Sequence, residues 1–311
     1  MPSYLAAING LLAAEAARHP DLVQFGENID KGSKICGIAR GLPGRVLNVG
    51  NCENTHVGVG LGLMLNGGKS VLYMKQLDFL PLAMDQIANT CNFLRCAPAG
   101  IAGSFTIVVI VCDHGFQGPQ SSFHDLAGLC AMGRVNGYTL TDRAAAEHIV
   151  STQSAQPGFR ILAVSQRMFS TELLDVPVLY SAPDASLFQY AEGGAATIVC
   201  FGFSLPAGLA LARRFAEQNN PAALFSVHPV LPHRWRPVVE SAASTRRVIA
   251  LDDAKGPCSL AHKLLHQVAQ AVPGCRTTAV TREEDVSFRV SADCFEPNLE
   301  ALAPQCYSLS S

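Results

Sequence analysis

Residues 50–58 read Gly-Asn-Cys-Glu-Asn-Thr-His-Val-Gly, and they join a short apolar run, residues 46–49, to a helical stretch, residues 54–65. The apolar run is typical of a strand buried on both faces of a parallel sheet, because its residues do not alternate with polar ones. A strand that leads directly into a helix is the repeating unit of α/β proteins. Glu53 stands at the predicted start of the helix, where a carboxylate interacts favourably with the helix dipole.

The same succession of strand and helix continues along the chain. Further strands are predicted over residues 70–74, 105–111, 137–141, 161–164, 197–202, 222–227, 248–252 and 277–280. Further helices are predicted over residues 80–95, 125–132, 143–154, 205–218, 235–243 and 259–271. This order predicts an α/β fold built from parallel sheets with right-handed crossovers.

The succession breaks over residues 167–193, which contain Pro177, Pro183 and a Gly193-Gly194 pair. A chain of 311 residues corresponds to about two domains at the usual domain size. We therefore expect two domains, residues 1–180 and 181–311, each with its own parallel sheet.

Composition narrows the classes of protein to which the chain can belong. The chain is 49% hydrophobic and 15% charged, with a net charge of −2, which favours a large core over disorder and argues against a nucleic-acid partner. The apolar stretches fall well short of the roughly 20 residues that a membrane helix needs, and the first residues lack a signal-peptide pattern. The low charge content predicts that part of the surface is covered by another chain.

Eleven cysteines, without a CxxC pair, indicate buried free thiols and a cytoplasmic location rather than disulfides or a metal site. The glycines of Gly58-x-Gly60-x-Gly62 lie inside a predicted helix, so they favour close helix–sheet packing over a dinucleotide loop. His262 and His266 are spaced to share a helix face, but without an accompanying Glu or Cys they are interpreted as ordinary histidines.

A second informative segment reads Tyr-Met-Lys-Gln-Leu-Asp-Phe over residues 73–79 and is followed by Ala83-Met84-Asp85-Gln86. Taken in order with Gly26-Glu27 and the Glu53 segment, it resembles the β subunit of 2-oxo acid dehydrogenase E1 enzymes and the pyrimidine-binding half of transketolase. Residues 118–122 (Gly-Pro-Gln-Ser-Ser) and the strand 197–202 are similar to later parts of that family. The resemblance implies a pyrimidine-binding thiamine diphosphate fold followed by a transketolase C-terminal-like domain.

The same resemblance implies roles for individual residues. Glu53 would share a proton with the aminopyrimidine ring of thiamine diphosphate, and a partly desolvated carboxyl suits that task. Phe79 matches the aromatic residue that stacks on the ring. Asn51 and Lys75 align with positions that approach the pyrimidine, and Lys75 and Gln76 are both candidates for contact with the substrate.

Half of the expected cofactor machinery is absent from the sequence. The diphosphate is held in this family through Mg²⁺ by a Gly-Asp-Gly motif, which does not occur here. The resemblance therefore implies an α-type partner subunit that carries the motif and the Mg²⁺. An α₂β₂ assembly with a β–β contact is expected.

The family histidine that follows Gly118-Pro119 has no counterpart at the aligned positions, which hold Ser121, Ser122 and Phe123. His124 is assigned as the catalytic substitute, and His114 is the alternative, because proton transfer needs only reach and a suitable pKa.

The leading functional hypothesis is the pyrimidine-binding subunit of a split transketolase-like transferase. Such an enzyme cleaves a ketose or a 2-oxo acid and passes the resulting fragment to an acceptor. The first alternative is an E1 β subunit that decarboxylates a 2-oxo acid and acylates a carrier thiol. The second is a non-catalytic scaffold that stabilises a partner.

Overall fold

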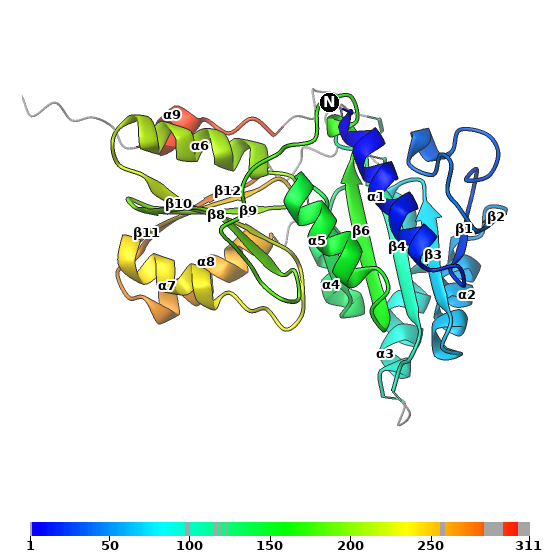
Figure 1. Cartoon of the computed structure of the whole chain (residues 1–311). Coiled ribbons are helices and arrows are strands. Elements are labelled where there is room, and N and C mark those ends of the chain that lie inside the picture. Colours follow the sequence, from blue (N-terminus) through cyan, green and yellow to red (C-terminus); the bar gives the residue numbers. More distant parts are fainter. Residues whose placement is uncertain are drawn as a thin grey trace, which may run out of the picture.

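A computed structural model describes residues 2–96, 100–114, 117–118, 120–121, 123–255, 259–282 and 295–303 of the chain. It contains two six-stranded sheets, each covered by helices on both faces (Figure 1). The predicted α/β class with two largely parallel sheets is confirmed.

The first sheet has the strand order β2-β1-β3-β4-β6-β5, and every neighbouring pair is parallel. Its strands are β1 (Val23–Gly26), β2 (Arg45–Asn48), β3 (Lys69–Met74), β4 (Ser104–Val111), β5 (Asn136–Thr139) and β6 (Gly158–Ser165). The sequence did not predict β1, because its four residues include a polar Gln24 and end in a glycine. Gln24 is only 1% exposed, and its amide donates to the carbonyl oxygen of Pro43 at 2.6 Å.

Helices α1 (Tyr4–Arg18) and α5 (Arg143–Gln153) pack together on one face of this sheet, and α2 (Glu53–Leu65) and α4 (Leu126–Gly133) lie on the other (Figure 1). The single helix predicted over residues 80–95 is divided into three elements. They are a 3₁₀ segment η2 (Leu77–Ala83), a π-helix η3 (Asp85–Thr90) and a short helix α3 (Cys91–Leu94). Pro81 lies inside η2 and cannot donate a backbone hydrogen bond, which disfavours a regular helix there. Two further 3₁₀ turns are η1 (Ile35–Gly37) and η4 (Gln166–Met168).

The second sheet has the order β12-β11-β9-β10-β8-β7. Its strands are β7 (Tyr180–Ser181), β8 (Leu187–Gly194), β9 (Thr197–Phe201), β10 (Ala222–Val227), β11 (Arg247–Asp252) and β12 (Arg276–Val280). Strands β7 and β8 form a hairpin within the segment where the sequence showed no regular element, and β8 runs antiparallel to β10. The boundary expected after residue 180 falls within β7, which belongs to the second sheet.

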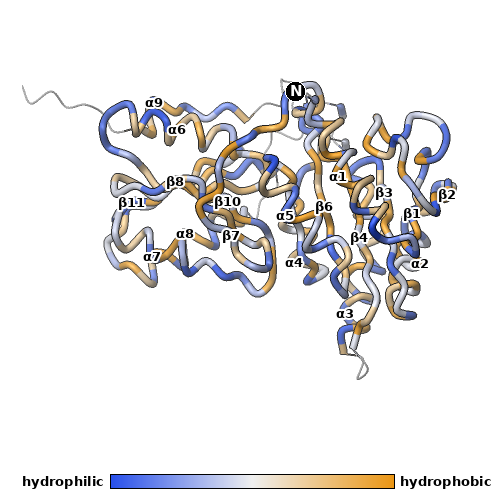
Figure 2. The backbone as a smooth tube through the Cα atoms, viewed as in Figure 1, coloured by the Kyte–Doolittle hydropathy of each residue, from blue (hydrophilic) through white to orange (hydrophobic). Residues whose placement is uncertain are grey.

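One face of the second sheet is covered by α6 (Leu205–Glu217), on which α9 (Leu299–Leu302) lies, and the other face by α7 (Arg236–Thr245) and α8 (Leu260–Ala271). Alternate residues of β9 point to these two faces. Ile198 belongs to the same apolar cluster as the core of the first sheet, whereas Val199 belongs to a separate cluster with α7 and α8. One continuous core therefore joins the two sheets, and Figure 2 shows hydrophobic segments along the strands of both.

The described cysteines are free thiols, as expected, but they are not uniformly buried. Cys91, Cys112, Cys130 and Cys200 are buried, whereas Cys36, Cys52 and Cys96 are exposed. Among the helices of the described segments, none combines the length and apolar character required to span a bilayer.

Candidate active site

The strand order of the first sheet marks a position for a site. From β1 the chain moves to β2 on one side and then returns to β3 on the other side of β1. In open parallel sheets, ligands bind beyond the carboxyl ends of the strands at such a point of reversal. The residues that follow β1 and β3 here are Glu27 and Lys75.

A group of charged side chains occupies this position. Burial raises the pKa of Glu27, and the negative charge of Glu53 raises it further. His56 and Lys75 act on the same carboxyl in the opposite direction, so all four side chains are close enough to interact electrostatically. Glu53 is half-buried and is the first residue of α2, whereas His56 is buried one turn later. The structure thus places the predicted catalytic acid beside a second acid at the reversal point.

Close packing of α2 against the sheet positions Glu53. A Cβ atom at Gly60 would overlap the ring of Phe105 on β4, so only glycine allows this separation between helix and sheet. Gly58 faces the side chain of Gln86, whereas Gly62 has open space around it. The packing interpretation of the glycine repeat is therefore confirmed at Gly60 and does not extend to Gly62.

The segment that follows β3 carries the other predicted cofactor residues. Phe79 is half-buried in η2, an element that packs directly against α2. Next to it, Asp78 is 6% exposed, and neither carboxylate oxygen has a hydrogen-bond partner within the described segments. Burial raises the pKa of Asp78, and Lys75 partly opposes this effect. The sequence analysis did not select Asp78, although it lies between two of the selected residues, Lys75 and Phe79.

The remaining predicted residues lie around this group. Asn51 is exposed in the loop before α2, and Lys75 is exposed at the end of β3. Gln76 is half-buried and donates to the sulfur of Cys112 at 2.9 Å, and Cys112 in turn has its pKa raised to about 11 by burial. His114 is exposed just beyond β4. Of the segment 118–122, Pro119 and Ser122 lie outside the described residues.

His124 makes its polar contact at the junction between the two sheets. It is 1% exposed, and its Nε2 is 3.2 Å from Oδ1 of Asp253, which is fully buried beyond the end of β11. Burial alone would raise the pKa of Asp253, but His124, Arg167 and Arg282 together hold that pKa well below its usual range. The hydrogen-bond partner of His124 is thus Asp253, which comes from the end of a strand in the second sheet.

Arg167 extends the junction back to the first sheet. Its guanidinium donates to Oδ2 of Asp253 at 3.0 Å and lies 3.6 Å from the carboxylate of Asp113. Asp113 in turn accepts hydrogen bonds from Ser165 at 2.6 Å and from the backbone N–H of Arg167 at 2.9 Å. Sequence reasoning missed this network. The available signal was that Asp113, Arg167 and Asp253 each follow the carboxyl end of a strand.

Within the described ranges, no three His, Cys, Asp or Glu side chains gather closely enough to hold a metal ion. The described part of the site thus contains the neighbouring carboxyls of Glu27 and Glu53, together with Lys75 and the ring of Phe79. It also contains the buried carboxyl of Asp78, which has no hydrogen-bond partner within the described segments.

Comparison with known proteins relates this chain to two groups. No protein-family model matches it. The acetoin:2,6-dichlorophenolindophenol oxidoreductase subunit beta of Cupriavidus necator is 22% identical, over 95% of this chain and 91% of that protein. The pyruvate dehydrogenase E1 component subunit beta of Rhizobium meliloti is 20% identical, over 85% of this chain and 59% of that protein.

Solved structures agree with this relationship at the level of the fold. A split-gene transketolase, described as an inactive β4 tetramer, superposes with a TM-score of 0.69 at 19% identity, covering 89% of this chain and 87% of that chain. Transketolase from Campylobacter jejuni gives a TM-score of 0.68 at 10% identity, over 90% of this chain but 42% of that one. The resemblance to E1 β subunits and to the C-terminal half of transketolase is thus confirmed.

Proposed function

We propose that this relative of the E1 β subunits, which has the fold of the transketolase C-terminal half, is the pyrimidine-binding subunit of a split thiamine diphosphate-dependent transferase. The observation that carries the proposal is the placement of Glu53. It begins α2 beside the reversal point of a parallel sheet and lies near Glu27, His56 and Lys75. The site residues present fit the pyrimidine half of the cofactor, because they combine a half-buried carboxyl with an aromatic ring on an adjoining element.

Thiamine diphosphate, when bound, supplies a carbon nucleophile that attacks a carbonyl group. The task of this chain is to hold the aminopyrimidine and its proton. Glu53 would share a proton with a ring nitrogen, and its own negative charge adds to the burial that raises the pKa of the neighbouring Glu27. Lys75 compensates part of this negative charge, and Phe79 would provide the stacking surface.

We propose different roles for the two histidines. His114 is exposed just beyond β4, the strand next to β3, so it is available for proton transfer to substrate. His124 is buried against Asp253 and would act by positioning the start of α4.

An α-type partner that supplies the Mg²⁺ and the diphosphate site is part of the proposal. Four large apolar side chains are exposed on α2 and on two elements that follow β3, and we call them the α2–α3 face. They are Val59 and Leu65 on α2, Leu82 on η2 and Phe93 on α3, between 43% and 79% exposed. Exposed apolar groups of this size commonly mark a protein interface. The transketolase neighbour described as an inactive β4 tetramer agrees with a β subunit that needs another chain.

Two reactions are compatible with this site. The related sequences are named as dehydrogenase β subunits, whereas the structural neighbours are transketolases. We favour transfer from a ketose, because the segment 118–127 resembles transketolase more closely, and we keep the E1-type decarboxylation of a 2-oxo acid as the second candidate. Release of an aldehyde from a ketose supports the first reaction, and release of CO₂ from a pyruvate-like acid supports the second.

The deciding experiment combines the chain with a partner subunit that bears the Gly-Asp-Gly motif, thiamine diphosphate and Mg²⁺. Turnover is compared among the wild type, Glu53→Ala and the control Glu217→Ala, which removes an exposed carboxylate at the end of α6. We expect the Glu53 variant to lose at least about 100-fold in kcat, as is typical of a lost proton-transfer group, and the control to be unchanged. Equal turnover of the wild type and Glu53→Ala would remove the basis of the proposal.

Assembly is tested separately from catalysis. Phe93→Glu places a charge on the α2–α3 face, and Leu179→Glu places one at an equally apolar, 56% exposed position beside β7. We expect only the first variant to fail to form the complex in size-exclusion chromatography. Unimpaired assembly by Phe93→Glu would move the α-type interface elsewhere.

A further inference from the structure

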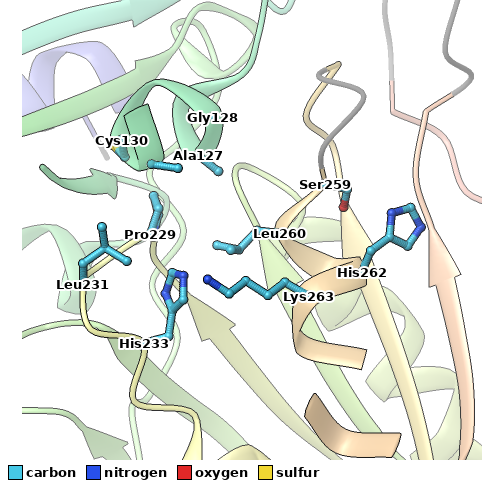
Figure 3. A pocket seen from close by; sticks show the side chains of 11 residues that line it. Ala127, Gly128, Cys130, Pro229, Leu231, His233, Ser259, Leu260, His262 and Lys263 are labelled. Carbon is cyan, nitrogen blue, oxygen red and sulfur yellow. The ribbon is translucent and has the colours of Figure 1, made fainter. Parts of the chain in front are cut away.

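A cavity of about 390 Å³ lies between the two domains, outside the site described above. Its walls come from α4 of the first domain and from α8 and the segment after β10 of the second (Figure 3). Pockets that bind small molecules are commonly of this size and lie between domains, with an apolar lining and a few convergent polar groups. Ala127, Cys130, Ala131, Pro229, Leu231 and Leu260 provide the apolar lining.

The described polar groups of the cavity are basic or neutral, and no Asp or Glu is among the described residues that line it. The Lys263 side chain extends toward His233, with Leu260 beside them (Figure 3). Burial and the nearby positive charge of Lys263 both lower the pKa of His233. Within the described segments, no carboxylate forms an ion pair with Lys263. The ammonium therefore faces this cavity without a neutralising charge.

His233 is fixed in place by an aromatic neighbour. Its ring stacks on Trp235, with centroids 4.4 Å apart and planes at 14°, and Trp235 itself is 2% exposed. The Nδ1 atom of His233 is buried and has no hydrogen-bond partner among the described residues. A water-sized molecule cannot reach this atom, so His233 contributes to the wall of the cavity by packing rather than by a hydrogen bond to a ligand.

We propose that this cavity binds a small monocarboxylate with an apolar body. The carboxylate pairs with Lys263, and the hydrocarbon part packs on Leu260, Pro229 and Ala131. A single carboxylate suits the site better than a phosphate, because Lys263 is the one lysine or arginine among the described residues that line it. The bound molecule would contact both domains next to the His124–Asp253 pair, since an adjoining smaller cavity shares Ala127 and Leu260 and reaches His124.

Trp235 is the one tryptophan of the chain, so its fluorescence reports directly on this cavity. The full-length protein is titrated with hexanoate, n-hexanol and inorganic phosphate, and the change in emission gives each dissociation constant. We expect saturable binding of hexanoate, with n-hexanol and phosphate at least tenfold weaker. Binding of hexanol as tight as that of hexanoate, or no saturation by hexanoate, would overturn the proposal.

Two variants test the named contacts. Lys263→Gln removes the ammonium at an exposed position, and Lys31→Gln makes the same change at an exposed lysine that does not line the cavity. We expect Lys263→Gln to weaken hexanoate binding by about 10- to 100-fold, as is usual for a lost hydrogen bond to a charged group, and Lys31→Gln to have no effect.

Ala131→Leu narrows the apolar end of the cavity and is expected to favour acetate over hexanoate. Equal affinity of Lys263→Gln and Lys31→Gln for hexanoate would contradict the proposed charge pairing. These readouts do not depend on the partner subunit or on turnover, so their failure would leave the proposed function untouched.

Discussion

The imidazole of His124 lies 3.2 Å from the carboxylate of Asp253, although 129 residues separate them in the sequence. One residue belongs to the domain of the first sheet and the other to the domain of the second. Both side chains are almost completely removed from solvent, at 1% and 0% exposure. The pair therefore connects the two sheets through a polar contact from which solvent is excluded.

Removing the carboxylate of this pair is expected to destabilise the protein strongly. Asp253→Asn removes the buried carboxylate that both His124 and Arg167 contact, and breaking a buried pair typically costs about 3–5 kcal/mol. Urea denaturation gives the free energy of unfolding. The matched control is Asp175→Asn, which breaks an exposed pair with Arg143 and should cost less than about 1 kcal/mol. A loss for Asp253→Asn no larger than for the control would show that the junction does not depend on this charge.

Two glycines of α2 are expected to respond in opposite directions to the same substitution. Gly60→Ala forces a methyl group into the ring of Phe105 and should destabilise the protein by about 1–3 kcal/mol. Gly62→Ala meets nothing within 4 Å and should stabilise it by up to about 1 kcal/mol, because alanine favours the helix. Thermal unfolding of the two variants measures both effects. Equal shifts in Tm would mean that α2 is not held against the sheet at Gly60.

The buried carboxyl of Asp78 gives a pH-dependent prediction. Its pKa in the folded protein is raised above the ordinary value of 3.8, so the folded state binds a proton more readily than the unfolded state. The stabilisation from this proton is complete below the unfolded pKa and is lost as the pH rises through the folded pKa. Asp78→Asn removes this penalty and should be more stable than the wild type by about 1 kcal/mol at pH 7.

The difference between the Asp78→Asn variant and the wild type should shrink as the pH falls through the folded pKa and disappear below the ordinary value of 3.8, because the carboxyl is then protonated in both the folded and the unfolded wild type. Denaturation curves at several pH values test this. Asp21→Asn, at a carboxylate whose side chain is 65% exposed, serves as the control. A gap between Asp78→Asn and the wild type that does not change with pH would mean that titration of Asp78 is not its source.

Phe79 is expected to contribute to cofactor affinity under the proposed function. Loss of an offset aromatic stack typically costs about 0.5–1.5 kcal/mol beyond the lost burial, so Phe79→Ala should raise the Kd for thiamine diphosphate at least about 2- to 12-fold in the reconstituted complex. Tyr180→Ala removes a 43% exposed ring on β7 and is the control. Calorimetric titration measures both. An unchanged Kd for Phe79→Ala would leave the ring only its packing role.

Much of the fold could be predicted, because buried parallel strands leave continuous apolar runs. Strand β4 is buried at every residue, and its predicted extent agrees to within one residue. Strand β1 was missed, since four residues with a buried glutamine carry too little hydrophobic signal. The β7–β8 hairpin was missed because prolines and glycines surround it, and its pairing with β10 depends on contacts remote in sequence.

The candidate site shows the same limit in finer detail. Glu53 and Phe79 could be selected because their order and spacing resemble those of a family. The proximity of Glu27 to Glu53 depends on the parallel alignment of β1 with β2 and β3, which no local pattern encodes. The burial of His124 was unpredictable for the same reason, because Asp253 comes from the other domain.

The apolar cluster that runs from one sheet into the other determines how the molecule comes apart. Phe203 and Ile249 belong to the second domain, yet they share this cluster with Leu140 and Val164 of the first. Within the described residues, the two sheets cannot separate without exposing apolar side chains of this cluster to water. We therefore expect the chain to unfold as one cooperative unit, with a single endotherm in scanning calorimetry, and proteolysis between the sheets to release aggregation-prone fragments rather than two independently folded domains.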